Sequence, residues 1–107
     1  MTTRREKIEA MLAEDPHDRL LRYGLALELE KEGRHDESLD GLRALTQESP
    51  PYVPAFFMSA QQLVRLGRIN EARAMLREGI EEARRQGDFH AAGEMGEMLA
   101  NLGALGE

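Results

Sequence analysis

Three side chains near the C-terminal end have types and spacing that could hold a metal ion. His90 and Glu94 lie four residues apart, and Glu97 follows three residues later, so a helix would carry all three on one face. One imidazole and two carboxylates form a small ligand set, and neither a second histidine nor a cysteine lies beside them. We therefore expect a solvated polar face at this position and predict no metal and no cofactor.

Carboxylates also cluster at two other places, but nothing in the sequence indicates that they do catalysis. General acid–base work needs an environment that separates the pKa values of two carboxyl groups. These clusters instead fall on the outer faces of predicted helices, with arginines at helical spacing beside them, which is typical of a solvated surface. No glycine-rich phosphate loop and no activated nucleophile is recognisable, so we predict no enzymatic activity. The residues concerned are Asp36 and Asp40, then Glu78, Glu81 and Glu82, with Arg43, Arg77 and Arg85.

Composition narrows the classes of partner. The chain has 20 acidic and 14 basic residues, and its net charge of −6 disfavours nucleic acid. A basic stripe of Arg73, Arg77 and Arg84 is interrupted by glutamates and lacks interleaved aromatic residues, so it does not change this expectation. There are no cysteines, no apolar leader follows Met1, and no apolar run is long enough to span a membrane. These features favour a cytoplasmic protein with neither a nucleic-acid nor a membrane partner.

The elements that would position any site are helices. Good helix formers dominate, and aromatic residues make up only 5% of the chain. Helix starts are predicted by the capping residues, and helix ends by glycines. The expected caps are Thr3 (with Glu6), Asp18 and Asp88, and the expected stops are Gly33, Gly67 and Gly87. We expect an all-α fold with helices over 3–14, 18–32, 35–48, from Pro54 to the stop at Gly67, over 69–85, and from Asp88 to about Asn101, with a frayed tail after it.

Four glycines lie inside these predicted helices, where each costs up to about 1 kcal/mol relative to alanine. They are Gly41, Gly79, Gly93 and Gly96. We expect close packing between helices to be the reason for all four.

The chain contains an internal repeat. Residues 19–52 match 53–86 at an offset of 34, and the clearest match pairs Gly33-Arg34 with Gly67-Arg68. A self-match at this period is the signature of a helix–turn–helix array. The matching positions are Ala26 and Ala60, Leu29 and Leu63, Glu37 and Glu71, Leu42 and Leu76, and Arg43 and Arg77.

These residues resemble the tetratricopeptide repeat family. The family pattern is met by Leu25, Ala26, Leu29, Ser38, Leu42 and Pro50 in one repeat, and by Phe56, Ala60, Leu63, Ala72, Leu76 and Gly79 in the next. Arg22, Leu45, Ser59 and Arg84 depart from it. The resemblance implies an alpha-alpha superhelix of about six short antiparallel helices in a single domain. We expect an N-terminal capping helix over 1–15, repeats over 16–52 and 53–86, and a C-terminal capping helix and tail over 87–107.

The resemblance also implies a function. In proteins of this family, the first helix of each repeat lines a concave groove that binds a peptide, so we expect a non-catalytic adaptor. A largely apolar peptide with a few basic residues suits the groove and the net charge. The alternative is a self-assembling structural homodimer in which Phe57, Met95, Met98 and Leu102 dock a twin that fills the groove. Carried over position by position, the groove residues are Tyr23, Leu27, Glu30, Lys31, Phe57, Gln61, Val64, Arg65 and Met95.

Overall fold

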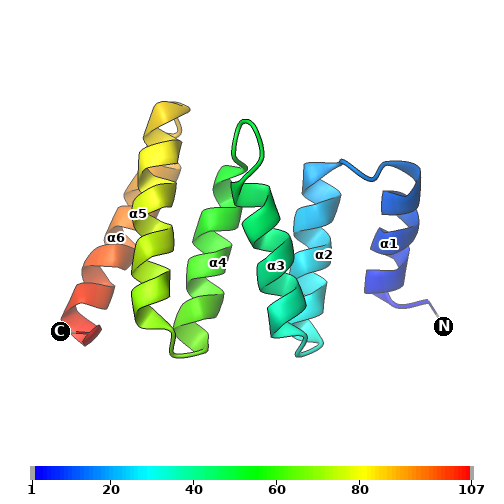
Figure 1. The fold of residues 1–107 in the computed structure, drawn as a ribbon, viewed down its shortest axis with the longest axis horizontal. Helices are drawn as coiled ribbons and strands as arrows, with labels where there is room; N and C mark the ends of the chain where they lie inside the picture. Colours follow the sequence, from blue (N-terminus) through cyan, green and yellow to red (C-terminus); the bar gives the residue numbers. More distant parts are fainter. Residues whose placement is uncertain (1, 107) are drawn as a thin grey trace.

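The computed structural model describes residues 2–106, which form six α-helices in a row. Successive helices run in opposite directions, from the N-terminus at one end of the row to the C-terminus at the other (Figure 1). The molecule measures 46 × 30 × 18 Å. None of the described helices is long and apolar enough to cross a membrane. The predicted all-α superhelical fold class is confirmed. The helices are α1 (Arg4–Glu14), α2 (Arg19–Lys31), α3 (His35–Thr46), α4 (Val53–Arg65), α5 (Ile69–Arg85) and α6 (Phe89–Gly106).

The same turn ends α2, α4 and α5. Gly33, Gly67 and Gly87 have φ angles of 80°, 78° and 78°, in the left-handed region that favours glycine. In each turn the glycine N–H and the N–H of the next residue bond back to helix carbonyls, as for Arg34 N to Leu29 O at 2.9 Å. The predicted glycine stops are therefore confirmed at all three positions.

Side chains cap the first turns of α1, α2 and α6. Thr3 and Glu6 form a reciprocal capping box. Asp18 accepts a hydrogen bond from Leu21 N at 2.9 Å, and Asp88 accepts one from Ala91 N at 3.1 Å. These are the capping residues that the sequence predicts.

The N-termini of α3 and α5 are stabilised by an arginine–glutamate pair instead of a capping side chain, and the sequence had not indicated this pairing. Arg34 donates two hydrogen bonds to Glu37, at 2.9 and 2.7 Å, and Arg68 donates two to Glu71, at 3.0 and 2.7 Å. The paired bonds hold a carboxylate in the first turn, where the helix dipole favours negative charge. They also lower the pKa of Glu37 and of Glu71 below the ordinary value of 4.5.

Two helix ends differ from the prediction. Helix α3 ends at Thr46, two residues before the predicted end at residue 48. The N–H of Tyr52 donates to the carbonyl of Leu45 and closes the loop that leads into α4. Helix α6 continues past Asn101 to Gly106, so the expectation of a frayed segment there is wrong. Arg73 of α5 donates to the carbonyl of Leu102 at 2.9 Å and ties this end of α6 down. Glu107 lies outside the described residues.

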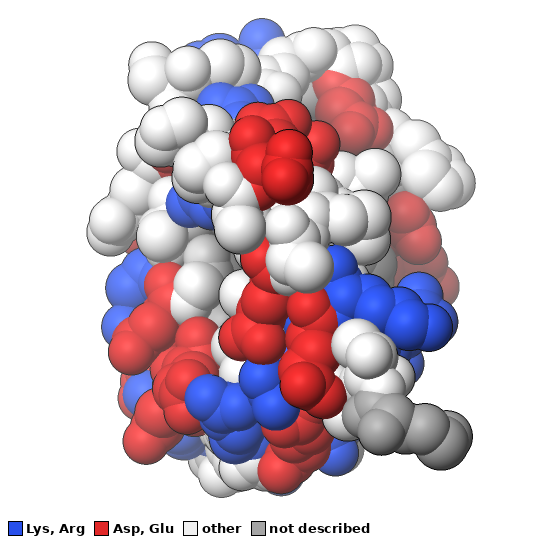
Figure 2. Space-filling view, turned by 90° about the vertical axis from the view of Figure 1, so that its right-hand side faces the viewer, with Lys and Arg blue, Asp and Glu red and all other residues white. Residues whose placement is uncertain are grey.

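Helix α1 docks on α2 mainly through charge. Ile8 is its only buried side chain among the described residues. Arg4 pairs with Glu28, and Arg5 pairs with Glu32, both across the helix boundary. Figure 2 views this end of the molecule, where acidic and basic side chains intermingle over the lower part.

The core is continuous along α3 to α6, with a smaller cluster between α2 and α4. Gly79 is the tightest point, because a Cβ there would lie 2.6 Å from both Met95 Sδ and Phe56 Cβ. Gly93 and Gly96 have nothing within 4 Å of such a Cβ, so close packing does not explain them and that expectation is wrong. The larger cluster includes Leu39, Phe56, Leu63, Leu76 and Met95, and the smaller comprises Ala26, Leu42, Leu45 and Ala55.

A buried polar contact joins the two hairpins. Ser38 Oγ donates to Ala26 O at 2.6 Å, and Gln62 Nε2 donates to Ser38 Oγ at 3.0 Å. Ser38 and Gln62 are at most 1% exposed. The contact ties α4 to the α2–α3 hairpin and sets how the neighbouring hairpins stack.

Candidate functional site

A depression of about 350 Å³ lies between α2 and α4. Leu27 and Met58 are half-buried in it and supply its apolar surface. Charged side chains surround them, so an apolar floor lies within a polar rim. The lining residues are Leu27, Glu30 and Lys31 from α2, and Met58, Gln61 and Arg65 from α4.

A second depression, of about 320 Å³, lies between α4 and α6. Phe57 and Met98 are its half-buried apolar residues. Gln61 lines both depressions and joins them into one groove along α2, α4 and α6. The lining residues are Phe57 and Gln61 from α4, and Glu94, Glu97, Met98 and Asn101 from α6.

Helix phase explains why these side chains face the groove. In α4 the buried stripe of Phe56, Ala60 and Leu63 faces the core. Phe57 and Gln61 are four residues apart and lie one position beyond that stripe, so they share the adjacent face. This second face is only partly covered by α6, and it stays accessible.

An ion pair crosses the groove between α4 and α2. Arg65 Nη2 donates to Glu30 Oε1, and the two residues are 35 positions apart in the chain. On α2, Glu28 Oε1 lies 3.4 Å from Lys31 Nζ and 3.0 Å from Arg4 Nε of α1. Charged groups of α2 and α4 therefore line one end of the groove, and Lys31 there shares Glu28 with Arg4 of α1.

Comparison with known proteins gives structural neighbours. A search with models of protein families found no match, and neither did a search of curated protein sequences. The solution structure of a tetratricopeptide repeat domain protein from Salinibacter ruber superposes with a TM-score of 0.79 at 28% identity, covering 84% of this chain and 91% of that one. The fold is that of the tetratricopeptide repeat family.

A protein from Bordetella parapertussis, also a solution structure, superposes with a TM-score of 0.81 at 29% identity. The match covers 97% of this chain and 90% of that chain, so it takes in the flanking helices as well as the repeats. The tetratricopeptide repeat fold is in general a scaffold for protein–protein interaction.

The structure brings six of the nine predicted groove residues together. Two others lie on groove helices but are engaged elsewhere. Tyr23 packs on Tyr52, with ring centroids 5.7 Å apart, and burial raises the pKa of its hydroxyl. Val64 packs against the larger core cluster. The six that line the groove are Leu27, Glu30, Lys31, Phe57, Gln61 and Arg65.

Met95 is not a groove residue. It is 0% exposed and packs against Gly79 in the core. A constant period of 34 places Met95 at the position of Gln61, but α6 begins 36 residues after α4. Helix α5 has 17 residues where α3 has 12, and the loop after α5 has 3 residues where the loop after α3 has 6. The longer helix and the shorter loop together shift the register by two, so Met95 corresponds to the buried Ser59 and Glu97 corresponds to Gln61.

The groove residues that the sequence analysis missed are Met58, Glu94, Glu97, Met98 and Asn101. The length of the predicted 69–85 helix could have indicated these residues. A second helix of unusual length can move the following helix out of the 34-residue period, so the positions that face the groove change there.

One further expectation, about α5, changes, and α6 carries His90 on an exposed face. Arg73 does not belong to an exposed basic stripe, because it is only 7% exposed and donates to Asn70 and to the Leu102 carbonyl. His90 Nε2 lies 3.1 Å from Glu94 Oε1, which makes an exposed helical pair. Across the described residues, no three histidine or acidic side chains come close enough together to hold a metal ion.

Proposed function

We propose that this chain is a non-catalytic protein-interaction module that binds a peptide segment in the groove formed by α2, α4 and α6. The observation that carries the proposal is the pair of apolar-floored depressions joined at Gln61. Half-buried apolar side chains within a charged rim are the composition expected of a site where a partner side chain becomes fully buried.

The groove also has the dimensions of a peptide site. Each depression, at about 320–350 Å³, has room for a large apolar side chain or two smaller ones. The two lie in series along the first helices of the repeats, so one extended or helical segment can occupy both. Apolar anchors in pockets then supply affinity, and the charged rim supplies selectivity.

The homodimer alternative loses two of its four docking residues, because Met95 and Leu102 are 0% and 3% exposed within their own chain. Phe57 and Met98 remain accessible, but both line the proposed peptide groove. Light scattering of the free protein distinguishes the two functions, since the peptide-binding module is expected to give the monomer mass of 12.1 kDa.

Selection from a random dodecapeptide library displayed on phage tests the proposal. We expect enriched peptides that lose at least about tenfold in affinity for Leu27→Ala/Met98→Ala, which removes one apolar side chain from each depression.

The matched control is Leu66→Ala/Met75→Ala, which deletes the same side chains outside the groove. Leu66 is partly exposed at the end of α4, and Met75 is half-buried on α5. Circular dichroism checks that both variants are folded. Enriched peptides that bind both variants equally well, or no enrichment at all, would contradict the proposal.

A further inference from the structure

One end of the groove is lined by cations from two helices, and one of these shares its acidic partner with a cation of a third helix. Arg4 of α1 and Lys31 of α2 approach the same carboxylate oxygen, Glu28 Oε1, at 3.0 and 3.4 Å. Arg65 of α4 reaches over to Glu30 of α2. Lys31 and Arg65 both line the α2–α4 depression. Lys31 and Arg65 thus bring two ion-paired groups, Arg4–Glu28–Lys31 and Glu30–Arg65, to this depression as one charged cluster.

Within this cluster the positive groups face outward. The side chains of Arg4, Lys31 and Arg65 are 78%, 69% and 56% exposed, whereas those of Glu28 and Glu30 are 12% and 18% exposed. The carboxylates thus lie beneath the cations that they pair with. An approaching ligand meets positive charge here, although the chain as a whole carries a net charge of −6.

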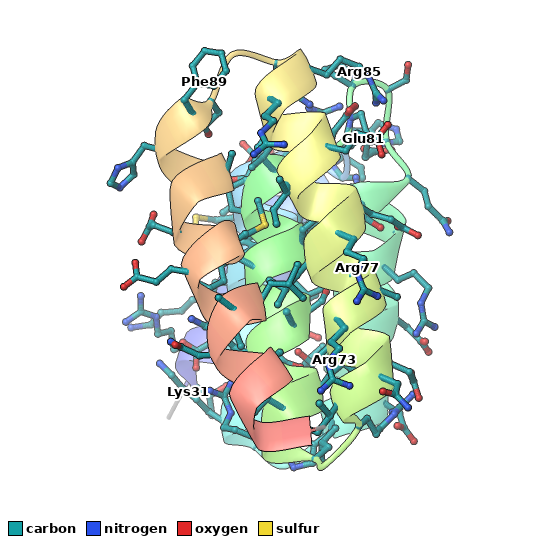
Figure 3. The ribbon with its side chains drawn as sticks, turned by 90° about the vertical axis from the view of Figure 1, so that its left-hand side faces the viewer. Lys31, Arg73, Arg77, Glu81, Arg85 and Phe89 are labelled. Atoms are coloured by element: carbon teal, nitrogen blue, oxygen red, sulfur yellow. The ribbon has the colours of Figure 1, made fainter. Side chains whose placement is uncertain are left out.

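The other end of the groove has the opposite character. Glu94 and Glu97 of α6 are exposed and line the depression that holds Phe57 and Met98. Figure 3 shows Lys31 on the opposite side of α6 from Arg77 and Arg85 of α5. The groove therefore runs from an exposed positive end to an exposed negative end.

We infer that the ligand of this groove is a protein segment that carries an acidic side chain over Lys31 and Arg65 and a basic side chain toward Glu94 and Glu97. Apolar side chains between them fill the two depressions. The inference rests on the proposed function and adds the charge order of the partner. It extends the sequence-based expectation of an apolar and basic peptide by one acidic position.

The donor count supports an acidic side chain at the positive end. A guanidinium has five N–H donors, and within the described part of the chain Arg65 gives one side-chain hydrogen bond, to Glu30. Lys31 has three donors and gives one, to Glu28, at 3.4 Å. Both cations retain donors for a ligand carboxylate, and such charge-assisted bonds are about twice as strong as neutral ones.

A nucleic-acid ligand fits the same observations less well. Its phosphates would repeat along the whole groove and would meet Glu94 and Glu97 at the other end. A protein segment can alternate its charges, so it suits a groove with one end of each sign.

The test uses dodecapeptides selected from the random phage library on the wild-type protein. Their affinity is measured for wild type, for Lys31→Gln/Arg65→Gln, and for the control Arg77→Gln/Arg84→Gln. The control removes the same two charges from exposed positions on α5. Each peptide is also made with its Asp or Glu replaced by Asn or Gln.

We expect the selected peptides to contain an acidic residue and to lose at least about tenfold in affinity for the Lys31/Arg65 variant, but less than about twofold for the control. The amide version should lose the same factor on wild type and almost nothing further on the Lys31/Arg65 variant. Groove-dependent peptides with no acidic preference would overturn this inference and leave the proposed function intact. No groove-dependent peptide at all would overturn both.

Discussion

Arg65 on α4 donates a hydrogen bond to Glu30 on α2, across the groove and 35 residues back along the chain. The arginine side chain is 56% exposed and the glutamate 18% exposed. Exposed ion pairs of this kind contribute little to stability, because solvent screens the attraction and ordering two long side chains costs entropy. The pair is therefore better placed to organise the ligand-facing surface than to hold the fold together.

The first prediction follows from that exposure. Arg65→Gln should change the free energy of unfolding by less than about 1 kcal/mol, because it removes a screened surface pair. Urea unfolding followed by circular dichroism measures it. A loss above about 2 kcal/mol would show that the pair is a structural element rather than part of a binding surface.

The second prediction concerns the packing of α5 against α4 and α6. Gly79→Ala should destabilise the protein by about 1–3 kcal/mol, because the new methyl group overlaps Phe56 Cβ and Met95 Sδ. The control is Gly93→Ala, which meets nothing within 4 Å and should stabilise by up to about 1 kcal/mol through helix propensity. Thermal unfolding measures the melting temperatures of both variants. Equal shifts of the two melting temperatures in the same direction would contradict the packing argument.

The third prediction concerns the buried contact between the hairpins. Ser38→Ala removes the acceptor of Gln62 Nε2, and the stranded amide should cost about 1–3 kcal/mol. Ser38→Ala/Gln62→Leu should recover most of that loss, because it removes both polar partners together. Urea unfolding of the two variants gives the comparison. A double variant no more stable than Ser38→Ala would contradict the view that loss of the Gln62–Ser38 hydrogen bond causes the destabilisation.

The fourth prediction concerns acid stability. Hydrogen bonds from Arg34 and Arg68 lower the pKa of Glu37 and Glu71 in the folded state below 4.5. Between the folded and unfolded pKa values the unfolded chain binds the extra protons, so stability falls as the pH falls. The stabilisation is fully present above about pH 4.5 and is lost as the pH drops through the lowered values.

Melting temperatures recorded from neutral to acid pH test this coupling. Glu37→Gln/Glu71→Gln mimics the protonated side chains, so its melting temperature should fall less than that of wild type below about pH 4.5. Glu14→Gln/Glu78→Gln makes the same charge change at other exposed positions and serves as the control. Parallel curves for wild type and the Glu37/Glu71 variant would contradict the assignment.

Local chemistry made much of this fold predictable from sequence. Thr3, Asp18 and Asp88 can each satisfy a free helix-end donor from their own side chain, and Gly33 and Gly67 can adopt the left-handed conformation. These residues act within one turn of the chain, so no knowledge of tertiary packing was needed. Together with the 34-residue period they predicted the helix–turn–helix array.

The site was less predictable, because helix phase depends on what packs against the helix. Leu27, Phe57 and Gln61 reached the groove because the offset from α2 to α4 is 34 residues, as the repeat predicts. Met95 did not, because the longer α5 and the shorter loop after it together move α6 by two residues, and the Met95 side chain then packs in the core at Gly79. Groove residues can be predicted from one repeat to the next only while the helices and loops keep the same lengths.

The most direct test of peptide binding in the α2–α4–α6 groove is a map of NMR chemical-shift changes. A dodecapeptide selected on the wild-type protein is titrated into the isotopically labelled full chain, and backbone amide shifts are followed. The account predicts the largest changes around Leu27 on α2, Gln61 on α4 and Met98 on α6, with small changes along the outer faces of α3 and α5. Largest changes on α3 and α5, with Gln61 unmoved, would contradict it.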